Sequence, residues 1–206
     1  MKESINKYNS TKFEMNFYPA DGGKIEIYDS IIKFGSIKSD DISKIIRIMK
    51  EKIELYKDSN IKYKLIYDAS KDGQNSANCH SKCNNVPNTF SLVKTCNGIK
   101  FGLFRSIAIN GQGPWRSDDK AFFMSLDKEK IYKMKNGNYI AFDDNYFIQI
   151  YSSLQLSGNI LSDKYTMPNK NNISHYFEGF TEDFELSGGF EKFTVNKFEV
   201  YQLEFL

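Results

Sequence analysis

The sequence predicts a mainly β protein of the α+β class, built as a two-sheet antiparallel β sandwich with one long helix and short flanking helical turns. Three observations support this prediction. From residue 63 onward, short runs of alternating apolar and polar residues follow one another, separated by turn signals. Asn97 and Gly98 join two such runs, and this pair is the strongest short-range signal for a β-hairpin. One segment, 40–57, keeps the apolar spacing of an amphipathic helix.

The N-terminal part reads as an appendage to one larger domain. After a polar start, apolar residues alternate through 13–17, a Pro-Ala-Asp-Gly-Gly turn occupies 19–23, and alternation resumes at 25–27. We therefore expect residues 1–29 to form a tail with a candidate hairpin, and residues 30–206 to form a single domain.

The predicted helix at 40–57 opens with two acidic residues, which suit the positive end of the helix dipole. Its apolar residues at helical spacing are Ile42, Ile45, Ile46, Met49, Ile53 and Tyr56. Such a face packs on a sheet of the same chain or pairs two chains as a coiled coil. The segment is shorter than the about three to four heptads of a coiled coil, so we favour packing on the sheet. Dimerisation through this helix stays the less favoured reading.

Turn chemistry sets the expected geometry at three places. With Asn97 and Gly98 as a two-residue turn, Lys94 faces Phe101 across the hairpin. The segment 72–73, Asp-Gly, reads as a turn in which the glycine takes a positive φ that other residues resist. The segment 111–115, Gly-Gln-Gly-Pro-Trp, interrupts the strand pattern, and we expect its tryptophan to be buried.

Composition and charge argue against several classes of function and location. The chain has 28 basic and 26 acidic residues, a net charge of +2, and the signs alternate along the sequence, which argues against nucleic-acid binding. The start lacks the apolar core of a signal peptide, and no run approaches the about 18 apolar residues of a membrane span. Three cysteines, an odd number, favour a reducing compartment. We expect a cytoplasmic protein without membrane insertion, and a monomer.

The residue types of a zinc site are present, but their spacing does not fit one. Structural zinc sites favour paired cysteines two to four residues apart with well-placed histidines. The candidate ligands here are Cys79, His80, Cys83, Cys96 and His175. We interpret His80 and Cys83 as small, half-buried side chains that pack under the hairpin, and we expect no metal. The glycine-rich segment 111–115 lacks the Lys-Ser/Thr of a phosphate loop, so we expect no nucleotide and no other cofactor.

Carboxylate pairs do not assemble a catalytic set in the sequence. Asp118 and Asp119, like Asp143 and Asp144, are neighbours that point to opposite faces of an extended chain, and we interpret both pairs as turn and capping residues. Glu199 lies in an apolar run and is either inward and partnered or on an exposed face.

A series of short motifs carries a family resemblance. It begins with Leu-Ile-Tyr-Asp-Ala-Ser-Lys-Asp-Gly at 65–73 and ends with the strand-like Phe-Glu-Val at 198–200. Between them lie His80, Cys83, the run 89–94, Gly98, Gly102, Trp115, Asp118, Ala121, Phe122, Ser125, Leu126, Glu191, Phe193 and Val195. In this order the motifs resemble the TLDc domain, the module of the oxidation-resistance proteins. The family often has a glycine-rich turn after its middle strands, whereas here Asp-Asp-Asn follows at 143–145.

The resemblance implies a non-enzymatic protein-binding module. The implied partner is the peripheral sector of the vacuolar proton-pumping ATPase (V-ATPase), and the implied role is tolerance of oxidative stress. Loops held by a rigid scaffold carry many binding sites, which points to 72–78 and 111–119 as contact surfaces. The candidate partner-contact residues are Asp72, Gly73, Asp118 and Asp119. The family-signature structural residues are Trp115, Gly98, Gly102 and Glu199.

The alternative function is a thiol- or carboxylate-dependent enzyme that handles peroxide or hydrolyses a substrate. Its candidate catalytic residues are Cys83, Cys79 and Glu199. Nothing in the sequence nominates a base and an orienting partner for a chosen thiol, so we favour the binding module.

Overall fold

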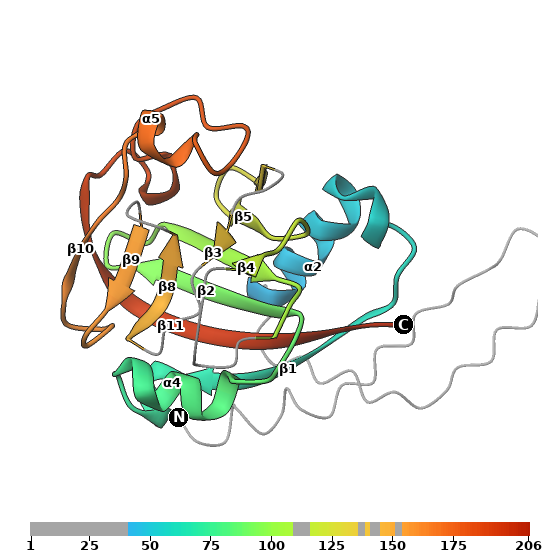
Figure 1. Cartoon of the computed structure of the whole chain (residues 1–206), viewed down its shortest axis with the longest axis horizontal. Helices are drawn as coiled ribbons and strands as arrows, with labels where there is room; N and C mark the ends of the chain where they lie inside the picture. Colours follow the sequence, from blue (N-terminus) through green and yellow to red (C-terminus); the bar gives the residue numbers. More distant parts are fainter. Residues whose placement is uncertain (1–40, 109–115, 136–138, 141–144, 151–153) are drawn as a thin grey trace, which may run out of the picture. The chain divides into compact units, whose positions relative to one another are not determined.

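The computed structural model describes residues 41–108, 116–135, 139–140, 145–150 and 154–206 (Figure 1). The strands are β1 (Ile61–Asp68), β2 (Thr89–Thr95), β3 (Lys100–Arg105), β4 (Arg116–Ser117), β5 (Phe122–Ser125), β6 (Lys130–Lys133), β7 (Tyr139–Ile140), β8 (Tyr146–Ile150), β9 (Leu154–Ser157), β10 (Lys164–Thr166) and β11 (Lys192–Phe205). The helices are α2 (Asp41–Lys52), α3 (Ala69–Asp72), α4 (Ser76–Cys83) and α5 (Lys170–Ile173), with 3₁₀ turns η2 (Glu54–Tyr56) and η3 (Glu185–Ser187).

One antiparallel sheet organises the domain. Its strands run in the order β1-β11-β2-β3-β5-β6, and β10 pairs with one end of β11. Two short ladders, β4 with β7 and β8 with β9, complete the described strands. The prediction of a mainly β, antiparallel fold is confirmed. The two-sheet sandwich is confirmed only in part, because the described residues form one seven-stranded sheet and two two-stranded ladders.

The central strands β2 and β3 are buried on both faces. One face, with Phe90 and Phe104, packs against the apolar stripe of α2. The opposite face, with Val93 and Leu103, packs with residues of α4, β8 and β9. Because successive side chains of a strand alternate between faces, cover on both sides buries polar residues of β2, such as Thr89 and Ser91, together with its apolar ones. This burial explains why β2 has no polar face to solvent.

Helix α2 lies where the spacing predicted a helix, but it is shorter. It spans 12 residues, and four of them are fully buried: Ile42, Ile45, Ile48 and Met49. The helix ends before Ile53, which takes extended angles (φ −123°, ψ 107°), and a 3₁₀ turn follows. The prediction of one helix through residue 57 is therefore wrong at its end, because the chain turns at Ile53 to place Tyr56 under the sheet. None of the described helices is long and apolar enough to cross a bilayer.

The β2–β3 hairpin turns at the predicted residues but with a different register. Lys94 pairs with Lys100 and not with Phe101, so the predicted register is wrong by one residue. The N–H of Gly98 donates to the carbonyl of Thr95 at 2.9 Å, and Gly98 has φ +86°. A turn followed by a left-handed glycine closes a three-residue loop, which shifts every cross-strand pair by one.

Several predictions fall on segments outside the described residues. These are the N-terminal tail and candidate hairpin, the boundary between 1–29 and 30–206, the burial of Trp115, and the Asp143-Asp144 pair.

Candidate functional site

Two of the predicted contact residues, Asp72 and Gly73, shape the connection between α3 and α4. The Asp72 carboxylate pairs with Lys82 and accepts the N–H of Asp68 at 2.8 Å. The ammonium of Lys82, followed by that N–H, lowers the pKa of the Asp72 carboxyl. Gly73 caps α3 with φ +102°, and a Cβ there would lie 2.6 Å from the Asn78 side chain. The predicted positive φ is confirmed, and the acceptor atoms of Asp72 are used inside the fold.

The adjacent acids Asp118 and Asp119 have opposite environments. Asp118 is 2% exposed and accepts the N–H of Ser106 at 2.7 Å and the N–H of Lys120 at 3.3 Å. Its own carbonyl accepts the N–H of Ala121 at 2.8 Å. Asp119 is exposed, and its side chain accepts only a local hydrogen bond from Ser117 among the described residues. Asp118 therefore fixes the turn that presents Asp119 to solvent.

Asp119 borders a cavity of about 170 Å³ between η2 and the start of β5. The cavity is lined by Ile53, Leu55, Tyr56, Asp119, Lys120, Ala121, Phe122 and Lys133. We call it the Leu55 pocket. Leu55 is 61% exposed, whereas Tyr56, Ala121 and Phe122 are buried. Charged side chains surround this apolar centre, and protein interfaces have the same arrangement of apolar core and polar rim.

The end of α2 explains why Leu55 is exposed. The extended Ile53 breaks the helical spacing, and the N–H of Tyr56 returns to the carbonyl of Ile53 at 2.9 Å. The Tyr56 ring then stacks on Phe205 with ring centroids 4.6 Å apart. Burial raises the pKa of Tyr56 to about 12, so its hydroxyl stays neutral. With Tyr56 turned inward, its neighbour Leu55 projects outward.

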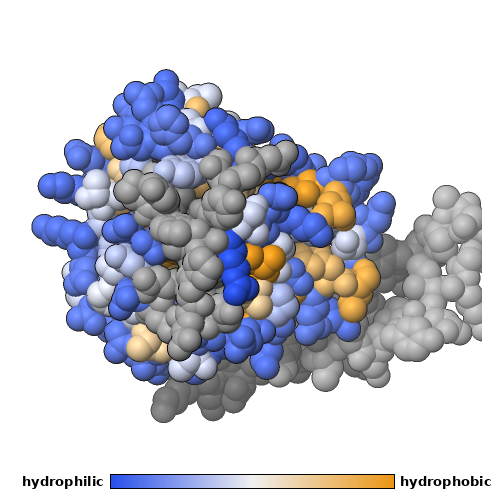
Figure 2. Space-filling model, in the orientation of Figure 1, coloured by the Kyte–Doolittle hydropathy of each residue, from blue (hydrophilic) through white to orange (hydrophobic). Residues whose placement is uncertain are grey.

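The surface view agrees with this placement. Figure 2 shows hydrophobic side chains gathered on the side of the domain where Figure 1 places α2 and η2. Large apolar side chains that are exposed elsewhere include Leu65 on β1 and Phe190 before β11.

A larger concavity, of about 590 Å³, lies among β9, β10 and α5. Its lining is mainly polar, with Gln155, Asn169 and Asn172 among its side chains. Asp163 also lines it, but the Asp163 carboxylate accepts the N–H of Asn159 at 2.8 Å and so closes a local turn. The geometry gives this concavity no apolar anchor comparable with Leu55.

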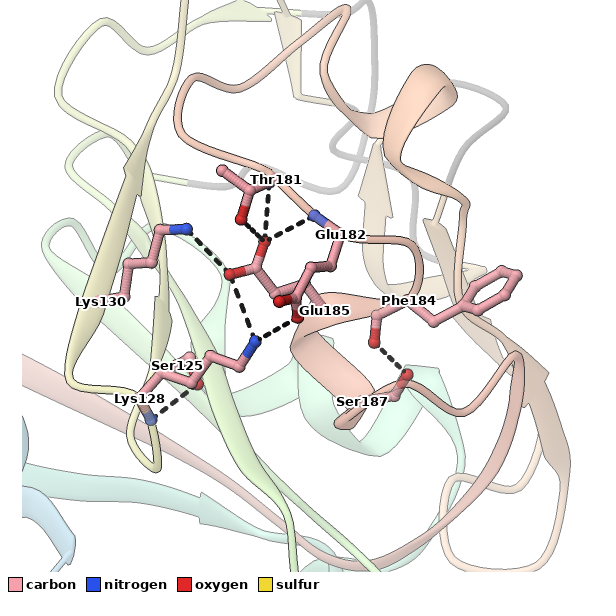
Figure 3. Close-up of polar contacts among 8 residues, drawn as sticks. All are labelled: Ser125, Lys128, Lys130, Thr181, Glu182, Phe184, Glu185 and Ser187. Atoms are coloured by element: carbon pink, nitrogen blue, oxygen red, sulfur yellow. Dashed lines mark hydrogen bonds and ion pairs between the residues drawn. The ribbon is translucent and has the colours of Figure 1, made fainter.

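Glu185 forms the most highly connected buried ion pair of the described residues. Figure 3 shows Lys128 and Lys130 pointing toward its carboxylate, with Nζ–Oε1 distances of 3.5 and 2.8 Å. The N–H of Thr181 donates to its other oxygen at 3.0 Å. Burial opposes ionisation of Glu185, but Lys130 and this N–H outweigh it and lower the pKa to about 2. The cluster holds η3 against the β5–β6 hairpin.

The family-signature residues that the structure describes have structural roles. Glu199 is 4% exposed and partnered, since its carboxylate accepts the Tyr201 hydroxyl at 2.8 Å and pairs with Lys197 at 2.7 Å. A Cβ on Gly102 would clash with the Phe90 ring, so β2 and β3 require glycine there. Glu199 is thus inward and partnered, which the sequence left open.

The candidate zinc ligands do not converge. Cys79, His80 and Cys83 share α4, whereas Cys96 lies in the β2–β3 loop and His175 follows α5. Within the described part of the chain, no group of three or more histidine, cysteine or acidic side chains is placed to hold a metal ion.

Two features of the structure were not predicted from the sequence, namely the exposure of Leu55 and the burial of Arg105. The exposure of Leu55 gave only a weak signal, namely its absence from the predicted apolar face of the helix. Arg105, which is 3% exposed at the end of β3, gave no signal, because its burial depends on what packs over the sheet.

Comparison with known proteins identifies the fold that holds these features. No curated protein matches the sequence. A family model described as the TLDc domain matches residues 35–204 of the 206-residue chain. Since this match covers most of the sequence, the chain belongs to the TLDc domain family.

Proposed function

We propose that this TLDc domain is a non-enzymatic protein-binding module of the cytoplasm. Its proposed partner is the peripheral sector of the V-ATPase, whose assembly or activity it regulates, and its proposed role is tolerance of oxidative stress. Family membership supports this class of function. The main observation in favour of a binding site is the Leu55 pocket, where an exposed leucine lies next to buried aromatic and aliphatic side chains.

The energetics of protein interfaces favour this pocket as the contact centre. Removing a large apolar side chain from water contributes about 1.5–3 kcal/mol. Interfaces depend on a few such anchors, surrounded by contacts that exclude water. Among the described residues, only the C-terminal Leu206 is a more exposed large apolar side chain than Leu55. Asp119, Lys120 and Lys133 at the rim supply charges of both signs for orientation and association rate.

The four predicted contact residues divide into two roles in this proposal. Asp119 borders the pocket and contacts the partner directly. Asp118 positions it through the turn that it anchors. Asp72 and Gly73 shape the α3–α4 connection and act on binding only through the fold.

The test measures affinity for purified peripheral-sector V-ATPase subunits from the same cell. Leu55→Asp replaces the apolar anchor by a charge and is expected to weaken binding at least tenfold, and Asp119→Lys to weaken it less. Leu65→Asp changes an exposed leucine that does not line the pocket, so it is the matched control. Unchanged affinity in Leu55→Asp, with the fold intact by circular dichroism, would reject the site.

The enzymatic alternative makes a different prediction. A carboxylate mechanism through Glu199 must compete with the Tyr201 and Lys197 contacts that occupy its oxygens. A thiol enzyme would consume hydrogen peroxide with many turnovers per chain, and Cys83→Ser would abolish that turnover. Turnover of this kind would show that the protein is an enzyme and would reject the proposal of a non-enzymatic binding module.

A further inference from the structure

A buried guanidinium lies on the sheet face opposite α2. Arg105 is 3% exposed, and its Nη2 is 3.5 Å from the Ser91 hydroxyl, a long hydrogen bond. Its Nε has no hydrogen-bond partner among the described residues, and neither has the hydroxyl of Thr89, its cross-strand neighbour. A buried cation is costly unless an anion balances it. The fold therefore holds a positive charge whose counter-charge needs identifying.

Two thiols lie on α4, which packs beside β1 (Figure 1), and both raise the pKa of Arg105. Cys79 and Cys83 are 4% and 1% exposed, and the Cys79 thiol donates to the Cys83 sulfur at 3.8 Å. Both belong to the same buried cluster as Leu103, which lies two residues before Arg105 on β3 and so on the same face. Residues four apart on a helix have Cα atoms about 6 Å apart, within the span of a disulfide, but their Cβ atoms are about 5–6 Å apart, so closing the bond requires α4 to unwind locally.

The charges around the two sulfurs favour one thiolate. The hydrogen bond from Cys79, then Arg105 and Lys82, lower the pKa of Cys83. The same hydrogen bond and burial raise the pKa of Cys79. Because the two pKa values shift in opposite directions, Cys83 loses its proton before Cys79 does. Burial lowers the pKa of Arg105, and the two cysteines oppose that shift.

Other titratable groups face the pair. Burial raises the pKa of Tyr67 on β1, so this hydroxyl stays neutral. The negative charge of Asp72 raises the pKa of Cys83 and so disfavours its thiolate. The negative charge of Asp118 raises the pKa of Arg105. The carboxylate oxygens of Asp118 also accept N–H groups of the neighbouring loops. Arg105 lowers the pKa of Cys83, and the two cysteines in turn raise the pKa of Arg105.

We propose that Cys79 and Cys83 form a reversible oxidation site for small peroxides, in which Arg105 holds the reacting sulfur as its anion. The Cys83 thiolate attacks one peroxide oxygen, the O–O bond breaks, and Cys83 becomes a sulfenic acid while the leaving hydroxide takes a proton and departs as water. The Cys79 sulfur then attacks the Cys83 sulfur, giving up its proton, and a second water leaves. Two thiols and one hydrogen peroxide give one disulfide and two waters.

This inference is independent of the proposed partner. The site lies on the face of α4, whereas the Leu55 pocket lies on the face of α2. Without a reductant, each chain consumes one peroxide and the reaction stops, so turnover measured in the absence of a reductant separates this site from the enzymatic alternative. It gives the two thiols of the enzymatic alternative a non-catalytic role as a pair that is oxidised together.

The experiment uses the full chain with Cys96→Ser, since Cys96 is exposed and would react first. Native protein is treated with hydrogen peroxide near neutral pH, and intact mass and free thiols after denaturation are measured. We expect the mass to fall by about 2 Da through loss of two hydrogens, with both thiols blocked and then restored by dithiothreitol. Thiols that stay free, or that gain oxygen without forming a disulfide, would overturn the proposal.

Single variants in the same background assign the roles. In Cys79→Ser, Cys83 should stop at the sulfenic acid and be trapped by dimedone, whereas Cys83→Ser should give no adduct. The reverse labelling would overturn the assignment. Arg105→Gln should slow dimedone trapping in Cys79→Ser about tenfold at neutral pH and move its pH midpoint upward. An unchanged pH profile would reject Arg105 as the positioning residue.

Discussion

At the scale of single residues, the buried acids of this domain act as acceptors that hold loops together. Asp118 shows this most clearly, because its neighbour Asp119 has the same chemistry and the opposite exposure. The sequence indicated that the two side chains point to opposite faces. It did not indicate which one is buried, because that depends on the N–H groups that the loop at Ser106 supplies.

The pair gives a matched stability test. Asp118→Ala leaves the N–H groups of Ser106 and Lys120 without their acceptor, and unsatisfied buried groups cost about 1–3 kcal/mol each. We expect the free energy of unfolding to fall by about 2–4 kcal/mol. Asp119→Ala, at an exposed position, should change it by less than about 0.5 kcal/mol. Urea titration measures both, and equal effects would contradict the assignment.

The Glu185 cluster predicts how stability depends on pH. Its folded pKa of about 2 lies below the value of about 4.3 for an unfolded glutamate, so the unfolded chain binds the proton first on acidification. This contribution to stability is full above the unfolded pKa and is lost as the pH falls toward about 2. Glu185→Gln should lower the melting temperature at pH 7, and the difference from wild type should shrink below pH ~4. A constant difference across this range would contradict the ion-pair role.

At the scale of elements, local signals predicted which segments form and tertiary contacts decided where they end. Ile42, Ile45 and Met49 were predicted as the buried stripe of the helix, and all three are buried. The helix end was missed, because stacking of Tyr56 on Phe205 involves the far end of the chain. The same contact turns Leu55 outward, so the candidate site could not be read from the spacing either.

The β2–β3 hairpin offers a second matched pair at this scale. Gly102→Ala would place a Cβ against the Phe90 ring and 2.7 Å from the Ser91 carbonyl, so we expect a loss of about 3 kcal/mol or more. Gly98→Ala meets no atom within 4 Å, and only its positive φ resists the change, at about 1 kcal/mol. Equilibrium unfolding of the two variants measures the difference. A smaller loss for Gly102→Ala would show that the strands can separate to accept a side chain.

At the scale of the whole molecule, motif order carried more information than any single motif. The TLDc resemblance rested on turns and strands spread along the sequence, and the family match over 35–204 confirms it. The packing of the sheet was harder to predict, because the strand order β1-β11-β2 brings the C-terminal strand between two earlier ones. That order depends on long-range pairing, which local alternation of residues does not encode.

The two proposed sites lie on opposite faces of the sheet. The α2 face has the exposed Leu55 pocket, and the α4 face has the buried thiol pair with Arg105. Because β2 and β3 are buried between them, a variant on one face can be tested with the other face as an internal control.

The most direct test of the account is hydrogen exchange of the domain with and without purified peripheral-sector V-ATPase subunits. We predict slower exchange on binding in 53–56 and 119–122, the segments that form the Leu55 pocket. Peptides from 163–172, around the larger polar concavity, should exchange at unchanged rates. Protection confined to 163–172, or no protection under saturating subunits, would contradict the claim that this domain binds its partner through the Leu55 pocket.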